Sequence, residues 1–217
     1  MRIWASITSI DLGELVDVGA RLQEAGVHGI HVDVSDGVFA PEITFGHRVV
    51  QALTSRLSLP VEAHLMVSDP ERQIAPLVDA GAARVAFHLE ATRYPWRVAG
   101  MTADLGVLAG VAVNPATPLD QLSHLSEGVS FVNVLTTEPD TRGERLLPRM
   151  ADRVRQVVGL AAPTAVQVDG GMGPESLAAM AAAGASDVVV GRALVAAADL
   201  GTRLQELRAA LGPRMQG

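Results

Sequence analysis

Two histidines and two aspartates lie at or near the ends of three short apolar segments of the sequence. One segment carries His31 and Asp33, the next carries His64, and a later one ends at Asp169. Side chains two apart on a strand point to the same side, so His31 and Asp33 can share one site. A single strand histidine is more often a hydrogen-bonded core residue, and Asp169-Gly170 alone is a common turn sequence. Together, two imidazoles and two carboxylates favour one divalent metal ion, Zn²⁺, Fe²⁺, Mn²⁺ or Co²⁺.

Two carboxylates on separate strands beside one metal ion are suited to moving a proton across a substrate. One aspartate can remove a proton next to a carbonyl, and the opposite aspartate can return a proton to the other face. The metal ion would stabilise the negative charge that develops on the enediolate oxygens. Two carboxylates alone would repel that charge. The pattern therefore predicts epimerisation of a small sugar.

The absence of two residue types narrows this chemistry. The 217 residues contain no cysteine, which excludes disulfides, thiolate nucleophiles and sulfur ligands. All 17 basic residues are arginine, so no lysine can form a Schiff base with a carbonyl. A net charge of −7 argues against a nucleic-acid surface. No apolar run reaches the roughly 18 residues of a membrane span, and Met1 leads directly into an apolar segment. We therefore expect a cytoplasmic protein with a small-molecule partner, and neither nucleic acid nor membrane.

Short β-branched segments alternate with longer segments of helical period, which is typical of repeated β-α-β units around a parallel sheet. The pattern predicts eight strands: Ile3–Thr8, Gly29–Val34, Val61–Met66, Arg84–Leu89, Leu108–Val113, Phe131–Leu135, Ala165–Val168 and Asp187–Val190. The helix-length segments between them include Leu12–Ala25, Pro70–Ala80, Pro148–Val158 and Pro174–Ala183. The length fits a single α/β domain over residues 1–217, a (β/α)₈ TIM barrel, with a doubly wound open sheet as the alternative. The C-terminal ends of barrel strands are where catalytic side chains gather.

Glycines follow the seventh and eighth predicted strands. Gly170 and Gly171 precede the helix that starts at Pro174, and Gly191 follows the last strand. The loops after these two strands commonly bind phosphate in barrels, because backbone N–H groups there can hold an anion. The glycines could instead serve only as tight turns, and a dinucleotide fingerprint would be expected after a first strand. We expect a phosphorylated substrate.

The order and spacing of several motifs resemble the ribulose-phosphate 3-epimerase family over almost the whole chain. The motifs are Ala5-Ser6-Ile7, Asp11, residues 31–39, Pro41, Thr44, His64-Leu65-Met66, residues 88–92, residues 114–118 and Val168-Asp169-Gly170-Gly171. The resemblance implies a metal-dependent barrel enzyme, an isomerase that inverts C3 of ribulose 5-phosphate to give xylulose 5-phosphate.

The resemblance also assigns individual roles. It implies that His31, Asp33, His64 and Asp169 hold one divalent ion, and that Asp33 and Asp169 double as the acid-base pair. Further residues would contact the substrate or lie beside the metal: Ser6, Met66, Gly170, Gly171 and Gly191. We also expect a homo-oligomer.

The loop after the sixth strand departs from the family pattern. Residues 138–144 carry charges where the family usually has a glycine-rich sequence, and Gly143 is the glycine left there to contact substrate. Guanidinium groups of Arg142, Arg145 or Arg192 could bind the phosphate instead, or all three could be surface charges. Arg192 stands where the family commonly has serine.

The surroundings of the expected metal site differ as well. Of the methionines usual there, only Met66 remains, since Ser35 and Leu135 occupy two of the other places. Glu42 replaces a customary asparagine. These changes make a six-carbon substrate the alternative, with interconversion of fructose 6-phosphate and allulose 6-phosphate.

Other functions are compatible with a barrel, because fold does not fix function. Barrels similar to indole-glycerol-phosphate synthase, orotidine-phosphate decarboxylase or Schiff-base aldolases need a lysine and are excluded. A metal-free histidine-biosynthesis isomerase would leave His31 and His64 unexplained. A barrel that has lost catalysis and acts as a binding subunit is the other alternative, and it would have no reason to retain stoichiometric metal.

Overall fold

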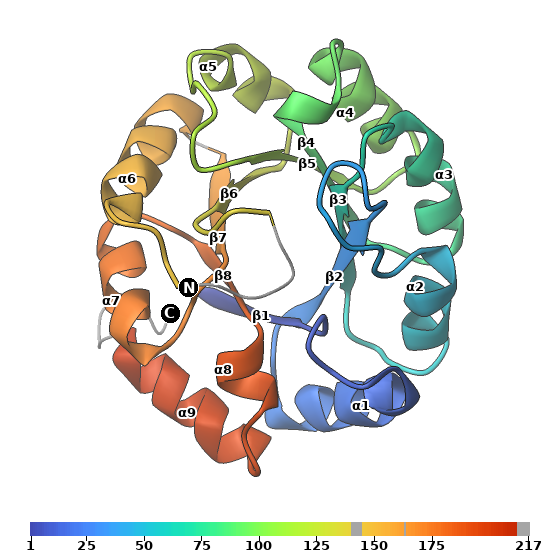
Figure 1. Cartoon of the computed structure of the whole chain (residues 1–217), viewed down its shortest axis with the longest axis vertical. Coiled ribbons are helices and arrows are strands. Elements are labelled where there is room, and N and C mark those ends of the chain that lie inside the picture. Colours follow the sequence, from blue (N-terminus) through green and yellow to red (C-terminus); the bar gives the residue numbers. More distant parts are fainter. Residues whose placement is uncertain (140–144, 163, 212–217) are drawn as a thin grey trace.

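The chain forms a closed barrel of eight parallel strands with helices around it (Figure 1), as described by a computed structural model. The structure describes residues 1–139, 145–162 and 164–211. The strands are β1 (Arg2–Ser6), β2 (Gly29–Ser35), β3 (Val61–Met66), β4 (Arg84–His88), β5 (Leu108–Val113), β6 (Phe131–Leu135), β7 (Ala165–Asp169) and β8 (Asp187–Val190). Strand β8 pairs with β1 and closes the barrel. The predicted TIM barrel is confirmed, and the open-sheet alternative is wrong.

Helices lie outside the strands on all sides (Figure 1). The α-helices are α1 (Leu15–Ala25), α2 (His47–Thr54), α3 (Glu71–Asp79), α4 (Pro95–Asp104), α5 (Leu122–Leu125), α6 (Met150–Ala161), α7 (Pro174–Ala182), α8 (Arg192–Val195) and α9 (Leu200–Ala210). Short 3₁₀ turns are η1 (Leu12–Glu14), η2 (Leu89–Ala91) and η3 (Ser126–Gly128). Among the described residues, none of the helices has the length and apolar character needed to cross a membrane.

The two faces of β2 bury different kinds of side chain. On β2, Ile30, Val32 and Val34 belong to the hydrophobic core that the helices cover. Such β-branched residues are common in the buried strands of parallel sheets. The alternate residues His31 and Asp33 point to the other face, into the barrel. On this strand the two-residue period therefore separates apolar side chains that face the helices from polar side chains that face the inside of the barrel.

Charged side chains close the N-terminal end of the barrel. Glu62, Arg84 and Asp187 come from the beginnings of three strands and are almost completely buried. The guanidinium of Arg84 lies between the rings of Trp4 and Phe131, 4.3 and 3.8 Å from their centres. Cation–π contact and the ion pair with Glu62 compensate for burial of this charge.

Element ends differ from the sequence prediction where side-chain or backbone contacts intervene. The first strand, predicted to reach Thr8, ends at Ser6 because the chain turns and the Thr8 hydroxyl bonds to Asp33. The helix predicted from Pro148 begins at Met150, since Arg149 adopts a left-handed conformation with φ 65°. The helix predicted from Leu12 starts as a 3₁₀ turn before α1.

Candidate metal centre

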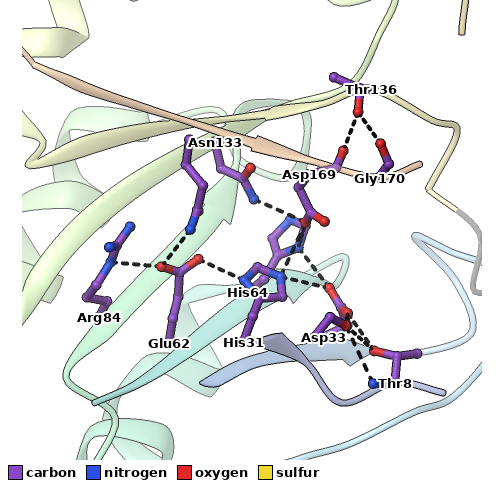
Figure 2. A network of polar contacts seen from close by, with 12 residues as sticks. Thr8, His31, Asp33, Glu62, His64, Arg84, Asn133, Thr136, Asp169 and Gly170 are labelled. Carbon is purple, nitrogen blue, oxygen red and sulfur yellow. Dashed lines mark hydrogen bonds and ion pairs between the residues drawn. The ribbon is translucent and has the colours of Figure 1, made fainter. Parts of the chain in front are cut away.

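The structure brings His31, Asp33, His64 and Asp169 together at the C-terminal ends of β2, β3 and β7 (Figure 2). One potential ligand atom from each lies within 4.8 Å of the others. His31 Nε2 is 3.1 Å from Asp33 Oδ1 and 3.2 Å from Asp169 Oδ2. His64 Nδ1 is 3.1 and 3.4 Å from the same two oxygens. The cluster could hold a metal ion.

Strand register explains why these residues meet. Asp33 is the register partner of His64 across the β2–β3 pair. His31 lies two residues earlier on β2, one layer deeper in the barrel. Asp169 ends β7, where the backbone N–H of Thr136 donates to the Asp169 carbonyl at 2.7 Å and the Thr136 hydroxyl lies 2.8 and 2.5 Å from the carbonyl oxygens of Asp169 and Gly170 (Figure 2). All four positions therefore belong to regular or closely held backbone.

Charges in the cluster favour an added cation. Burial lowers the pKa of the His31 imidazole, but Asp33 and Asp169 outweigh it and raise that pKa well above its ordinary value. Burial likewise raises the pKa of Asp169, and contacts with His31 and His64 overcome this and bring it to about 2. The pKa of Asp33 is held well below its ordinary value by the same imidazoles against the effect of burial. Two ionised carboxylates thus face one point, which attracts a proton or a metal ion.

A second layer of side chains orients His31. Its Nδ1 lies 3.0 Å from Glu62 Oε1, and Arg84 Nε lies 2.8 Å from Glu62 Oε2 (Figure 2). Gln167 Nε2 donates to the same Oε2 at 3.3 Å. A carboxylate that accepts from one imidazole nitrogen leaves the other nitrogen with its lone pair for a metal.

His64 has a different partner behind it. Its Nε2 is 2.9 Å from Nε2 of the fully buried His88, whose Nδ1 is 3.0 Å from Glu90 Oε2. Burial lowers the pKa of His88 to about 4. The pKa of Glu90 is lowered to about 2, because the contact with His88 and other hydrogen bonds outweigh its burial. A neutral imidazole and an ionised carboxylate follow from these values at neutral pH.

Two hydroxyl groups hold the second oxygen of Asp33. Ser6 Oγ donates to Asp33 Oδ2 at 3.1 Å, and Thr8 Oγ1 donates to it at 2.5 Å. Asp33 Oδ1 meanwhile faces both imidazoles. The two oxygens of this carboxylate therefore have separate surroundings.

A cavity of about 390 Å³ opens above the cluster. Its walls include Ser6, Thr8, Asp33, His64, Met66, Leu135, Arg145, Asp169, Gly170, Gly171, Gly191 and Arg192. Asp33 and Asp169 thus reach a space of the size used for small-molecule binding.

Most residues singled out in the sequence lie around this cavity. Ser35 does not line it, since its hydroxyl donates to the carbonyl of Glu42 at 2.6 Å. Gly143 and Arg142 fall outside the described residues. Sequence reasoning gave no role to Glu62, although it precedes His64 by two positions and so shares its strand face. It gave no role to Thr8 either, although Thr8 follows Ser6 by two positions.

The comparisons with known proteins agree over most of the chain. A model of the Ribulose-phosphate 3 epimerase family matches residues 2–195. The chain is 33% identical over 212 residues to the cytoplasmic isoform of ribulose-phosphate 3-epimerase from Oryza sativa subsp. japonica, covering 95% of this chain and 92% of the relative. It is 33% identical over 214 residues to ribulose-phosphate 3-epimerase from Methanocaldococcus jannaschii, covering 97% and 91%.

Solved structures with similar folds include other barrels. A 3-hexulose-6-phosphate synthase superposes with a TM-score of 0.71 at 21% identity, covering 97% of this chain and 99% of that one. KGPDC from Streptococcus mutans gives a TM-score of 0.76 at 13% identity, covering 100% and 99%. These likenesses support the fold alone, whereas the family model and the 33% identity confirm the predicted isomerase class. The chain belongs to the ribulose-phosphate 3-epimerase family.

Proposed function

We propose that this chain is a metal-dependent ketose-phosphate 3-epimerase that interconverts ribulose 5-phosphate and xylulose 5-phosphate. The observation that supports it most is the convergence of two imidazoles and two carboxylates within 4.8 Å, with Asp33, His64 and Asp169 lining a cavity. The chain would act as one catalytic domain. Its relatives from rice and M. jannaschii are named for the same pentulose phosphate.

The donor atoms fit a divalent ion. Two imidazole nitrogens and two carboxylate oxygens form a mixed nitrogen and oxygen set that suits Zn²⁺, Fe²⁺, Mn²⁺ or Co²⁺. His31, Asp33, His64 and Asp169 would be the ligands. When bound, the ion would stabilise the negative charge of an enediolate.

The two aspartates would carry the proton transfer. Asp33 and Asp169 come from β2 and β7 and both line the cavity, so a substrate between them presents opposite faces. One carboxylate removes the C3 proton and the other returns a proton from the opposite side. Ser6 and Thr8 hold Asp33 Oδ2 for this task.

Phosphate would bind at the loops after β7 and β8. Gly170 and Gly171 have φ values of 104° and 66°, and a Cβ on Gly171 would lie 2.5 Å from the backbone nitrogen of Leu146. Glycine at residue 171 therefore lets the backbone of the loop after β7 pack closely against the backbone at Leu146. Arg145 and Arg192 line the same cavity as these glycines and Gly191, and would add positive charge. Met66 would contact the sugar from β3.

Solvent-exchange NMR tests the proposal. Metal-loaded protein in D₂O should replace the C3 hydrogen of ribulose 5-phosphate with deuterium as xylulose 5-phosphate forms. Asp169→Asn should abolish this exchange while circular dichroism shows an intact fold. Unchanged turnover in this variant would remove Asp169 from the mechanism.

A parallel sample separates the substrate alternatives. The replacement of two methionines, with Leu135 in the cavity wall, favours testing fructose 6-phosphate beside ribulose 5-phosphate. Faster deuterium incorporation into the hexulose would make the chain a six-carbon epimerase. Loss of catalysis with retention of a binding role would give no exchange and no stoichiometric metal.

A further inference from the structure

His88 and Glu90 stand behind His64 and have no part in the proposed proton transfer. His88 ends β4, and Glu90 lies in the turn η2 that follows. The contacts form an unbroken line from Glu90 Oε2 through both nitrogens of His88 to His64 Nε2, at 3.0 and 2.9 Å. The other nitrogen of His64 faces Asp33 and Asp169. A surface turn is thereby connected to the metal centre.

The protons along this line can be placed by their partners. The Glu90 carboxylate can only accept, so the single proton of a neutral His88 lies on Nδ1. His88 Nε2 is then an acceptor, and His64 must donate to it through its own Nε2. A neutral His64 consequently keeps the Nδ1 lone pair directed at the metal centre.

The reverse arrangement is the competitor. With its proton on Nε2, His88 would donate to His64 Nε2 and the His64 proton would move to Nδ1. Asp33 Oδ1 lies 3.1 Å away and would accept that proton. The contacts from His88 to His64 and from His64 to Asp33 would again each have one donor, but His88 Nδ1 and Glu90 Oε2 would meet as two acceptors. A proton would also occupy the nitrogen that must bind the ion. The acceptor at residue 90 decides between the two arrangements.

Glu90 is itself held in one orientation. Its Oε1 accepts from the backbone N–H of Asn114 at 2.8 Å and from the hydroxyl of Thr117. Arg153 of α6 fixes this turn by donating to the carbonyls of Asn114 and Thr117 at 2.8 and 2.6 Å. With Oε1 fixed by two donors, only Oε2 can face His88.

We propose that Glu90 and His88 are positioning residues that keep His64 in the tautomer whose Nδ1 is open to the metal ion. This rests on the proposed function in one respect, that the ligand of the cluster is a divalent cation. The carboxylate of Glu62 contacts His31 directly and fixes its tautomer, whereas the carboxylate of Glu90 acts on His64 through the intervening imidazole of His88. The two metal-binding imidazoles thus depend on different residues.

The variant Glu90→Gln should reverse the line without changing the size of the side chain. Asn114 and Thr117 would hold the amide oxygen, so the NH₂ group would donate to His88 Nδ1 and drive the His88 proton to Nε2. Zinc affinity, measured by competition with a chromophoric chelator, should fall about 10–100-fold, the usual effect of losing an outer partner of a ligand. Thr117→Val is the matched control: it removes one donor to Oε1 but leaves a carboxylate facing His88, so its zinc affinity should stay near that of the parent.

A second measurement needs neither metal nor turnover. Long-range ¹H–¹⁵N spectra of the metal-free, ¹⁵N-histidine protein should place the His88 proton on Nδ1 in the parent and on Nε2 in Glu90→Gln, with His88→Asn identifying the signals. A proton on Nε2 in the parent, or unchanged zinc affinity in a folded Glu90→Gln protein, would overturn the proposal. If the parent binds no metal, the proposed function fails, and the His88 spectrum still reports on the proton positions separately.

Discussion

The hydroxyl oxygen of Thr8 lies 2.5 Å from Oδ2 of Asp33, while Oδ1 of the same carboxylate faces both imidazoles. This contact leaves one oxygen for a cation and fixes the other toward the cavity. It also ties the loop after β1 to the end of β2. The oxygen of Asp33 that faces away from the imidazoles is therefore held by a group outside the candidate metal cluster.

Replacing Thr8 by valine should slow the chemistry more than substrate binding. The substitution keeps the shape but removes a hydrogen bond to a charged group, worth about 1.5–3 kcal/mol, so kcat should fall at least about tenfold with KM little changed. Steady-state kinetics check this. Thr8→Ser retains the hydroxyl and should recover most of the rate, whereas equal losses in both variants would point to a steric effect instead.

Removing the charge of Arg84 should destabilise the whole barrel. Arg84→Met leaves the buried Glu62 carboxylate without its ion pair, which costs about 3–5 kcal/mol. Equilibrium urea unfolding of the metal-free protein measures the loss. The double variant Arg84→Met/Glu62→Gln should regain part of it, and no recovery would mean that Arg84 acts mainly through its contacts with Trp4 and Phe131.

Metal ions should raise the thermal stability of the metal-free protein. An ion that binds only the folded state adds about 4 kcal/mol at a thousand times its Kd, or roughly 8–16 °C in Tm for a chain of this size. Thermal unfolding after chelator treatment and Mn²⁺ or Zn²⁺ addition tests this. His64→Gln should show a much smaller shift, and an equal shift would place the ion elsewhere.

Asp36 should make folding stability depend on acid pH. Burial raises the pKa of this carboxyl, but hydrogen bonds from Ser68, Phe39 and Val38 outweigh it and hold the pKa well below its ordinary value. The contribution is therefore present above the unfolded pKa of about 4 and is lost as pH falls toward the folded pKa. Urea unfolding should show Asp36→Asn less stable than the parent at pH 7, with a smaller difference at pH 3. A constant difference would exclude this titration.

Gly171→Ala should disturb the loop expected to bind phosphate. The new Cβ would lie 2.5 Å from the backbone nitrogen of Leu146, and φ of 66° adds roughly 1–2 kcal/mol of strain for alanine. KM for the sugar phosphate should rise and Tm should fall. Gly159→Ala, in α6 with nothing within 4 Å of the new Cβ, should instead stabilise the protein by about 0.5–1 kcal/mol with unchanged kinetics.

The barrel and the central cluster could be predicted because strand period and strand ends are local properties. His31 and Asp33 share a face by their spacing alone, and barrel closure brings β7 to them. The partners behind the cluster could not be predicted in the same way. Glu62 meets Arg84 through the β3–β4 register, and His64 meets His88 across the same pair of strands. Such contacts depend on which residues of neighbouring strands face each other, and this register cannot be read from a single sequence.

The side chains at the beginnings of the strands have a consequence for variation in this protein. Arg84 packs against the rings of Trp4 and Phe131 and contacts Glu62, which in turn contacts His31. A continuous series of contacts therefore joins the N-terminal end of the barrel to the candidate metal centre. A substitution at the N-terminal end, far from the cavity, would alter turnover if it changed the orientation of Glu62 and therefore of His31. Searches for mutations that change the rate should therefore include the buried residues at the N-terminal end of the barrel as well as those around the cavity.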